Sequence, residues 1–591
     1  MASPAFPPLT RRRKRPRPSV VVAPLPAVSK WRPVIVWALL MLAIVGLGGR
    51  LAWLQLVQGD TLAQRAQQQH VVPTAPQPLR YPIVDRQGNV LAVDRMVYTL
   101  YGHPKLFKQS PTQVAAALSP ILATPDLELL SQLSRQPTGV RVADGVTAEV
   151  ADRIRGLRLD GLELIPQPQR FYPQQELFAP IVGFVNLEGK AQAGLEIAQQ
   201  DKLLRPVVDD GDDTAESTAP TADPAATAPA SLRLTLDSRL QRIAQQALQT
   251  VVTRHQAKRG TVMVMEVNTG EMLALATVPT YDPNRYFEAD ISAFKNWAIS
   301  DLYEPGSTFK PLNVAIALDN QAITPDELVS DSGRMQFGEW LIKNHDYATA
   351  GGRGPISITD VLRYSSNVGM VRIMQKLSAE TYFDWLQKLN LSQPTGIDLP
   401  AEAEGHMKNR DQFIRSKVEL ATTSFGQGFS VTPIKMLQIE ATLANGGKLV
   451  TPHVIRDMVA ADGTSLWTPE RPAPRSVFSP QTSQQVLEMM AAVVATGTGS
   501  PAQVPGYRIA GKTGTAQKAN PTGGYGRGRI TSFVGILPVQ APRYVVLAVI
   551  DEPQGDNAYG STVAAPLVKQ VIESLVVLES MPPDPAEPAA P

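Results

Sequence analysis

The longest apolar run of the chain lies near its N-terminus, at residues 33–57. It is uncharged up to Arg50 and continues beyond that residue into a second apolar stretch that contains Trp53. About 20 apolar residues are needed to cross a bilayer, and tryptophan favours the membrane interface. The pattern therefore predicts a single transmembrane helix over residues 33–57.

Residues 1–32, which precede this run, are rich in proline and contain a basic stretch from Arg11 to Arg15. Such a composition cannot bury a core, so we expect a disordered tail. Positive residues stay on the cytoplasmic side, which predicts a single-pass protein of the inner (cytoplasmic) membrane with a periplasmic or otherwise extracytoplasmic catalytic part. A cleaved signal peptide is the alternative, but no small-x-small cleavage site follows the run closely.

Residues 60–206 mix short strand-like and helical patterns without a dense cluster of reactive side chains. Residues 80–92 are typical of a strand, a turn at Gln87-Gly88-Asn89 and a second strand. We interpret the region as a mixed pedestal, a spacer module without catalytic residues. We expect the following charged residues in it to be solvated or paired for structural reasons: Arg80, Asp85, Arg86, Arg170 and Glu196.

Two further boundaries follow from composition. Residues 207–231 are acidic and rich in alanine and proline, which predicts a mobile linker. Residues 232–580 regain regular patterns, and residues 581–591 form a proline- and alanine-rich tail that we expect to be disordered.

Within residues 232–580, strand patterns lie at both ends and helical patterns lie between them. A strand at 232–236, a helix capped by Asp237 and a hairpin over 261–276 begin the module; strands at 532–537 and 544–551 and an amphipathic helix at 562–578 end it. Strands from both ends predict one antiparallel sheet flanked by helices, with a helical region inserted. The whole chain is therefore predicted to be an α+β multidomain protein.

The composition of the 591-residue chain narrows its chemistry. It has no cysteine, which excludes disulfides, thiolate metal sites and a cysteine nucleophile. A formal net charge of +2 gives no reason to expect nucleic-acid binding. We expect neither a metal nor another cofactor.

The strongest chemical signal is Glu304-Pro305-Gly306-Ser307-Thr308-Phe309-Lys310-Pro311. A Pro-Gly turn precedes Ser307, and an apolar helical pattern follows it, so Ser307 is expected at a helix start. Lys310, three positions on, then lies on the same helix face, and its amine can reach the hydroxyl. A lysine in a dry pocket can be neutral enough to act as the base for such a nucleophile. A second Ser-x-x-Lys copy begins at Ser292, and alone either copy is a weak signal.

Two later motifs distinguish the copies. Ser365-Ser366-Asn367 lies between two helix-like runs, where a hydroxyl can relay a proton and an amide can hold a peptide backbone. Lys512-Thr513-Gly514-Thr515 follows an expected edge strand, where a cation, two hydroxyls and a glycine suit an extended peptide that ends in a carboxylate. Three motifs in this order are a strong signal.

From about residue 56 to residue 578 the chain resembles the class B penicillin-binding proteins, most closely the FtsI family of cell-division peptidoglycan D,D-transpeptidases, whose catalytic domain is serine β-lactamase-like. The Ser-Ser-Asn form resembles the division branch. The acidic linker and the long basic tail depart from the family pattern. Further matching motifs are Asp85-Arg86-Gln87-Gly88, Tyr172-Pro173, Gly194-Leu195-Glu196 and Phe425-Gly426-Gln427-Gly428.

The resemblance implies an acyl-enzyme mechanism for cross-linking stem pentapeptides. Ser307 attacks the penultimate D-alanine, with Lys310 as base, Ser365 as proton relay and Lys512 as electrostatic support. The backbone N–H groups of Ser307 and Thr515 form the oxyanion hole. The implied substrate-binding residues are Asn367, Thr513, Gly514 and Thr515.

The resemblance also implies partners. β-Lactams act as inhibitors, and an FtsW-type glycan polymerase and other divisome membrane proteins act as partners, because residues 60–206 show no glycosyltransferase motif. Alternatives are an elongation-branch transpeptidase, a D,D-carboxypeptidase, a β-lactamase, and a catalytically inert divisome scaffold or β-lactam sensor. The membrane anchor, the spacer module and the lack of an evident deacylating glutamate motif argue against the lactamase.

Overall fold

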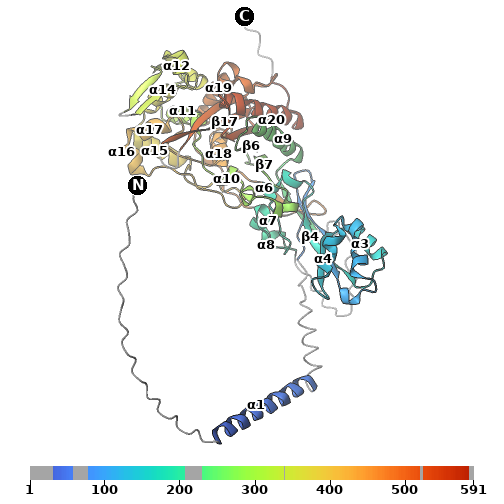
Figure 1. Cartoon of the computed structure of the whole chain (residues 1–591). Helices are drawn as coiled ribbons and strands as arrows, with labels where there is room; N and C mark the ends of the chain where they lie inside the picture. Colours follow the sequence, from blue (N-terminus) through green and yellow to red (C-terminus); the bar gives the residue numbers. More distant parts are fainter. Residues whose placement is uncertain (1–30, 57–77, 206–228, 338–339, 520–523, 585–591) are drawn as a thin grey trace, which may run out of the picture. The chain divides into compact units, whose positions relative to one another are not determined.

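The computed structural model describes residues 31–56, 78–205, 229–337, 340–519 and 524–584 (Figure 1). Packing divides the chain into two units, Met1–Pro76 and Gln77–Pro591. The predicted N-terminal tail and nearly all of the predicted linker lie outside the described residues.

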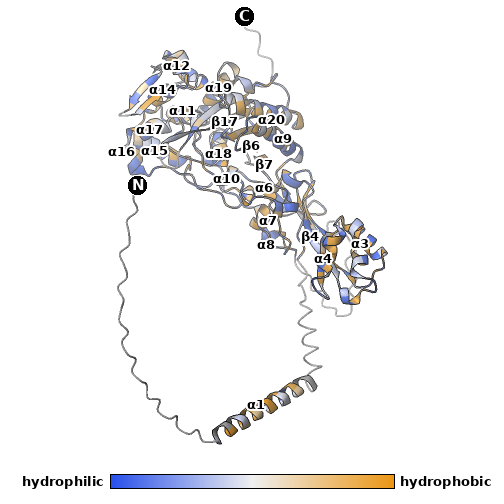
Figure 2. Cartoon of the chain, in the orientation of Figure 1, coloured by the Kyte–Doolittle hydropathy of each residue, from blue (hydrophilic) through white to orange (hydrophobic). Residues whose placement is uncertain are grey.

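Helix α1 (Trp31–Leu56) is the described part of the first unit. It begins and ends within two residues of the predicted transmembrane helix, and hydrophobic residues recur along it (Figure 2). The large apolar side chains described in it are exposed. Among the described residues, one helix, Gly560–Leu578, is long and apolar enough to cross a membrane, but half of it is buried and it belongs to the core of the second unit; the apolar stretch within α1, Trp37–Trp53, is shorter. Helix α1 is therefore the candidate membrane anchor.

The pedestal is built on strands β1 (Ile83–Val84), β2 (Val90–Gly102), β3 (Val140–Val146) and β4 (Leu162–Phe171). The predicted strand, turn and strand over residues 80–92 are present: β1 pairs with β2 across a turn that Asp85 holds by accepting hydrogen bonds from the N–H groups of Gln87 and Asn89. Its helices are α3 (Pro111–Leu122), α4 (Asp126–Leu133), α5 (Ala148–Gly156), α6 (Ala179–Val182), α7 (Gly194–Ala198) and α8 (Gln200–Leu203).

One sheet crosses the expected boundary between the pedestal and the catalytic module. Its strand order is β14-β13-β5-β1-β2-β3, with β4 on β2. β5 (Ala230–Leu234) pairs in parallel with β1 and antiparallel with β13 (Ile455–Ala460), which pairs with β14 (Ser465–Trp467). The pedestal is therefore not a free-standing spacer, because strands from the later module complete its sheet.

The catalytic sheet has the order β16-β17-β18-β6-β7 and is antiparallel throughout. The late strand β18 pairs with the early strand β6, so strands from the two ends of the module form one sheet, as the sequence pattern predicted. The bounds are β6 (Arg259–Glu266), β7 (Met272–Val278), β16 (Ala510–Ala519), β17 (Tyr525–Leu537) and β18 (Tyr544–Asp551).

Helices cover both faces of this sheet (Figure 1). α9 (Ser238–Arg254), capped by Asp237, and α20 (Ala565–Leu578) share one apolar core with one face. α11 (Lys310–Asp319) and α18 (Pro433–Ala444) contribute to the core on the other face. The inserted region contains α10 (Trp297–Ser300), β8 (Leu328–Asp331), β9 (Arg334–Phe337), β10 (Trp340–Lys343), α12 (Tyr347–Ala350), β11 (Gly354–Ser357), α13 (Ile358–Arg363), α14 (Asn367–Met374), α15 (Ala379–Lys388), α16 (Arg410–Arg415), α17 (Lys417–Thr423) and α19 (Pro480–Thr496).

Two predicted ends of this module differ from the structure. β5 begins at Ala230, inside the predicted linker, because this small side chain is buried against the shared sheet. The predicted C-terminal tail is packed as far as Asp584: Met581 is buried, its carbonyl accepts a hydrogen bond from the Tyr507 hydroxyl, and Asp584 N–H donates to Gly506 O. A Pro-rich composition did not reveal these tertiary contacts.

Candidate active site

Ser307 lies in a short 3-10 turn, η5 (Gly306–Phe309), which leads directly into α11. Gly306 has a φ of +60°, and its N–H donates to Gly426 O at 2.9 Å. A left-handed backbone at this point favours glycine. Ser307 therefore lies just before the helix, as predicted, in a 3-10 turn that precedes the first residue of α11.

The side chain of Lys310 is fully buried and reaches the second motif. Its amine donates hydrogen bonds to Ser365 O at 2.6 Å, Asn367 Oδ1 at 2.8 Å and Ser365 Oγ at 3.3 Å. In the described part of the chain no hydrogen bond joins this amine to Ser307 Oγ. Helical spacing predicted that contact, but it could not reveal that acceptors in the loop between α13 and α14 and at the start of α14 compete for the amine.

Lys512 approaches the same serine from the sheet. Its buried amine donates to Ser365 Oγ at 3.0 Å and to Thr513 O at 3.0 Å. Ser365 itself has a left-handed φ of +57°, an uncommon conformation for a side-chain-bearing residue. The Ser365 hydroxyl therefore lies between two lysine amines, and the three motifs form one cluster.

Burial controls the electrostatics of this cluster. Desolvation lowers the pKa of Lys310 well below its ordinary value, and the neighbouring Lys512 lowers it further. Desolvation also lowers the pKa of Lys512 to about 7, against an opposing effect of Glu440. Both amines therefore give up a proton more readily than an exposed lysine does, as a base and its electrostatic partner require.

A cavity of about 540 Å³ opens over the cluster. Side chains from all three motifs lie on its wall, together with residues from the loop before α12. Its walls include Ser307, Ser365, Asn367, Thr513, Thr515, His345, Asp346, Thr498, Gln517 and Tyr559. The cavity is large enough for part of a peptide.

Strand β16 forms the edge of the catalytic sheet beside this cavity. A Cβ added to Gly514 would lie 2.3 Å from Ser532 Oγ and 3.1 Å from Pro305 O, so only glycine lets the strand approach the Ser307 turn. Thr513 Oγ1 contacts Thr498 Oγ1 at 3.0 Å, and Thr515 Oγ1 accepts from Gly560 N at 3.1 Å. The edge strand is therefore held close to Ser307, so that a substrate peptide pairing with this strand would lie next to the nucleophile.

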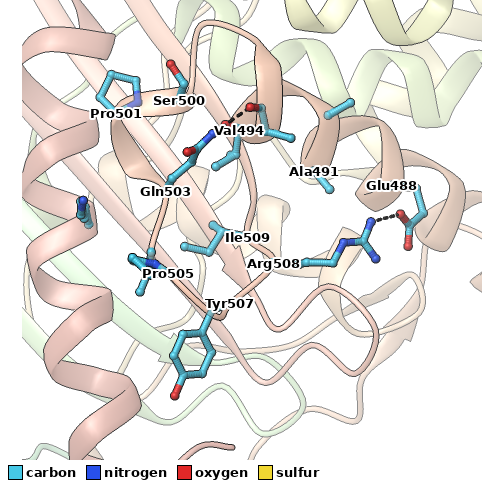
Figure 3. Close-up of a pocket in the computed structure, with 14 residues that line it drawn as sticks. Glu488, Ala491, Val494, Ser500, Pro501, Gln503, Pro505, Tyr507, Arg508 and Ile509 are labelled. Atoms are coloured by element: carbon cyan, nitrogen blue, oxygen red, sulfur yellow. Dashed lines mark hydrogen bonds and ion pairs between the residues drawn. The ribbon is translucent and has the colours of Figure 1, made fainter. Parts of the chain in front are cut away.

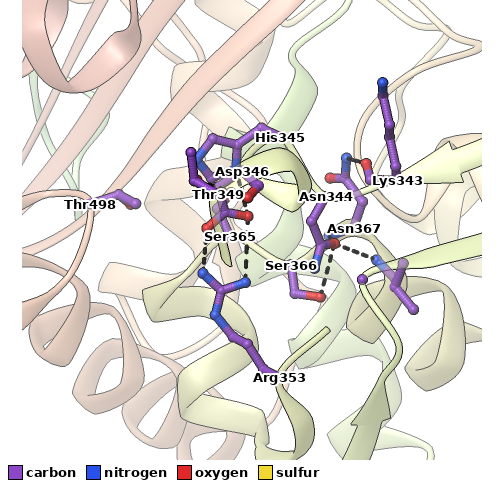
Figure 4. Close-up of polar contacts among 12 residues, drawn as sticks. Lys343, Asn344, His345, Asp346, Thr349, Arg353, Ser365, Ser366, Asn367 and Thr498 are labelled. Atoms are coloured by element: carbon purple, nitrogen blue, oxygen red, sulfur yellow. Dashed lines mark hydrogen bonds and ion pairs between the residues drawn. The ribbon is translucent and has the colours of Figure 1, made fainter. Parts of the chain in front are cut away.

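The sequence analysis missed a supporting asparagine. Asn344 Oδ1 accepts hydrogen bonds from Asn367 N at 2.9 Å and Val368 N at 3.1 Å, and its Nδ2 donates to Asp331 (Figure 4). Asn344 thus holds the start of α14, which carries Asn367. It follows a short strand in a segment without a motif, so no local signal identified it.

The second Ser-x-x-Lys copy lies elsewhere. Ser292 is exposed in a short 3-10 turn, and Lys295 is more than half exposed and forms an ion pair with Asp301. Neither residue lines the cavity over Ser307. The structure therefore separates the two copies as the surrounding motifs predicted.

Another cavity, of about 620 Å³, lies between α19, residues 500–509 and α20 (Figure 3). The ion pair between Arg508 and Glu488 lies at its wall, and none of the predicted site residues lines it. Among the described residues, no cluster of three or more His, Asp or Glu side chains could hold a metal ion.

Comparisons with known proteins agree with this geometry. Residues 260–573 match the model of the penicillin-binding protein transpeptidase domain, and residues 76–203 match that of the penicillin-binding protein dimerisation domain. The chain is a class B penicillin-binding protein of the FtsI family. The predicted family and fold class are confirmed.

Individual relatives share nearly the whole chain. A peptidoglycan D,D-transpeptidase FtsI homolog from Mesostigma viride is 39% identical over 578 residues, which cover 93% of this chain and 96% of the relative. Peptidoglycan D,D-transpeptidase FtsI from Escherichia coli K12 is 29% identical, over 94% of this chain and 93% of the relative.

The solved structures include penicillin-binding protein 3 from Mycobacterium tuberculosis complexed with aztreonam. It has a TM-score of 0.66 and 28% identity, and the match covers 86% of this chain and 98% of that one. Together with the apolar helix α1, family membership indicates a membrane-anchored protein with a soluble catalytic part.

Proposed function

We propose that this FtsI-family protein cross-links peptidoglycan stem peptides as a serine D,D-transpeptidase in septal wall synthesis. The observation that carries the proposal is the buried series of hydrogen bonds from Lys310 through Ser365 to Lys512, in which Ser365 lines the same cavity as Ser307. A serine next to two desolvated amines and a proton-relaying hydroxyl is equipped for acyl transfer.

In the acylation step, Ser307 Oγ attacks the carbonyl carbon of the penultimate D-alanine. Lys310 takes the hydroxyl proton, and Ser365 passes a proton to the leaving D-alanine amine while Lys512 supports the developing charge. The N–H groups of Ser307 and Thr515 stabilise the oxyanion. An amine of a neighbouring stem peptide then attacks the acyl-enzyme and forms the cross-link.

The substrate peptide is proposed to lie along β16. Thr513 and Thr515 hold its terminal carboxylate, and Gly514 permits the close approach. Asn367 holds the peptide backbone, although in the free enzyme its amide is occupied by Lys310 and by Lys343 O, to which Nδ2 donates at 3.0 Å. Substrate binding therefore exchanges at least one of these hydrogen bonds.

The cellular setting completes the proposal. α1 spans the inner (cytoplasmic) membrane, with residues 1–32 in the cytoplasm and the catalytic module outside. Because residues 60–206 contain no glycosyltransferase motif, an FtsW-type polymerase supplies the glycan strands and other divisome membrane proteins recruit the enzyme. The proposed domain bounds are 1–32, 33–57, 60–206, 207–231, 232–580 and 581–591, with the first four residues of the last range packed on the catalytic module.

Intact-mass spectrometry of the full-length protein with a β-lactam tests the nucleophile. We expect one adduct on the peptide that contains Ser307, absent in Ser307→Ala and retained in Ser292→Ala. Incubation with a pentapeptide and an amine acceptor should then give a new amide. Hydrolysis without amide formation would favour a carboxypeptidase. Localisation dispersed along the wall rather than at midcell would favour an elongation enzyme, and the absence of any adduct would favour an inert scaffold.

A further inference from the structure

An acidic residue lies buried beneath the catalytic cluster without a hydrogen-bonding partner. Glu440, on α18, is 0% exposed, and neither of its carboxyl oxygens accepts a hydrogen bond from a described residue. The Tyr303 hydroxyl is also buried without such a partner, and the Glu440 carboxyl acts on it electrostatically. A buried carboxyl in this state is costly unless it is neutral or faces a cation.

Strand register places this carboxyl and Lys512 on the same face of the sheet. Lys512 pairs with Val534, which pairs with Leu547 on the next strand, and directly paired residues point to the same face. Val534 and Leu547 share their core with Ile439 and Leu443 of α18, on either side of Glu440. α18 therefore covers the face on which the side chain of Lys512 stands.

Charges on the other elements complete this environment. After burial, Lys512 is the next cause that lowers the pKa of Lys310, on α11; Asp331 and Asp346 oppose this shift, and Asp346 also acts on His345. On the α18 side, the acid that acts on Lys512 is Glu440. Lys512 thus lies next to a second buried amine on one side and a buried acid on the other.

We propose that Glu440 is a positioning residue that sustains the positive charge of Lys512 during acylation. The pair shares one proton: on the carboxyl it leaves both groups neutral, and on the amine it makes Glu440 a carboxylate and Lys512 an ammonium. The same single proton accounts for both states, and the two charges stabilise each other in the dry core. This role depends on the proposed acyl transfer by Ser307.

The pH profile of β-lactam acylation by the full-length protein tests the proposal. Glu440→Gln removes the charge but keeps the shape, so Lys512 loses its proton at lower pH. We expect the alkaline limb of the pH–rate profile to move to lower pH by about one unit. The acylation rate should then fall by about tenfold on that limb and by less than about twofold near pH 6. A rate reduced equally at every pH would overturn the proposal.

Two matched variants separate electrostatics from packing. Glu440→Asp keeps an acid and should restore the limb to within about half a pH unit. Gln438→Met, on the same helix, removes the buried hydrogen bond to Val450 O and should lower Tm without moving the limb. A limb that moves equally in Gln438→Met would show that packing alone sets the profile and would contradict the role of Glu440.

A double-mutant cycle tests the coupling between Glu440 and Lys512 without an activity assay. Urea unfolding of Glu440→Gln, Lys512→Met and the double variant should give non-additive effects, equivalent to at least about a tenfold coupling in the unfolding equilibrium constant. Additive effects would overturn the inference. If the wild-type protein forms no β-lactam adduct, the proposed function fails instead, and this cycle alone decides on Glu440.

Discussion

The molecule contains two buried clusters of charged residues that have opposite electrostatic balance. In the pedestal, Arg80 and Arg170 face Asp94 and Glu196. Arg170 Nε lies 2.6 Å from Glu196 Oε1, its Nη1 lies 3.1 Å from Asp94 Oδ1, and Arg80 Nη1 lies 3.1 Å from Glu196 Oε2. Every one of these side chains is almost fully buried, and each cation has an acid within ion-pair distance.

The catalytic cluster has two cations that share one hydroxyl. Lys310 and Lys512 both donate to Ser365, and their remaining hydrogen bonds go to neutral oxygens. The pKa of Arg170 is raised by its acids, despite burial, whereas burial and mutual repulsion lower the pKa of Lys310. Burial thus fixes charge where acids lie within ion-pair distance, and it makes amines reactive where no described acid comes that close.

The largest expected effect tests the reactive side of this comparison. Lys310→Met should reduce β-lactam acylation by about 10³-fold or more, because the nucleophile loses its base. Its free energy of unfolding at pH 7 should be unchanged or higher, since a desolvated amine is removed. Fluorescent-penicillin labelling and urea unfolding measure the two quantities.

Another buried lysine provides the matched control. Lys435, on α18, has a pKa lowered to about 8 by burial, and its amine donates to Gln438 Oε1 at 2.8 Å, away from the cavity. Acylation by Lys435→Met should stay within about threefold of wild type. An equal loss in both variants would mean that burying an amine, rather than its place in the cluster, governs activity.

The next effect concerns the paired cluster. Glu196→Gln leaves Arg80 and Arg170 buried with a single acid between them, and breaking a buried pair typically costs about 3–5 kcal/mol. We expect a loss of this size in urea unfolding, with acylation of the folded protein unchanged. A variant that keeps its stability but loses acylation would instead assign this cluster to catalysis.

An exposed pair in the same pedestal is the control. Glu163 Oε2 lies 3.0 Å from His103 Nε2 and is more than half exposed. Exposed ion pairs contribute about 0–1 kcal/mol. Glu163→Gln should therefore leave the free energy of unfolding within this range of wild type.

These two clusters also show what sequence can predict. The motif residues Ser307, Ser365 and Lys512 were assigned to one site, and the sheet was predicted from strands at both ends of the module, because those signals are local. For Arg80, Arg170 and Glu196 the sequence predicted only that each would be solvated or paired. It did not predict which residues pair, because the partners lie up to 116 residues apart.

What the sequence did not predict depends on long-range geometry. The Lys310 amine bonds to Ser365 and Asn367 because a left-handed residue turns that loop toward α11, and backbone dihedrals are not readable from Ser-Ser-Asn. Asn344 supports α14 from a segment without a motif. Pairing of β5 with β1, which joins the two modules in one sheet, likewise depends on tertiary contact rather than on local pattern.

A smaller effect, the pH dependence of the free energy of unfolding, also distinguishes the two clusters. The folded-state pKa of Lys512 is lowered from 10.5 to about 7, so between these values the unfolded chain binds the proton more readily. The stability contribution of Lys512 is therefore full above about pH 10.5 and is lost as pH falls toward 7. In urea unfolding, the stability of Lys512→Met relative to wild type should rise by about 1–3 kcal/mol from pH 10 to pH 7.5.

The paired cluster supplies the contrast for this measurement. Glu196 and Asp94 raise the pKa of Arg170 despite its burial, so the stability loss of Glu196→Gln should be flat between pH 7.5 and pH 10. A flat Lys512→Met difference would show that Lys512 is not desolvated in the folded protein.

The smallest effect concerns a third lysine environment, the exposed copy of the Ser-x-x-Lys motif. Lys295 is solvated and paired with Asp301, so its amine lacks the burial of the two amines beside Ser365. Ser292→Ala should acylate within about twofold of wild type and change the free energy of unfolding by no more than about 0.5 kcal/mol. Since the two copies share the same spacing, an adduct on the Ser292 peptide would mean that spacing alone creates reactivity; its absence would assign reactivity to burial beside a second cation.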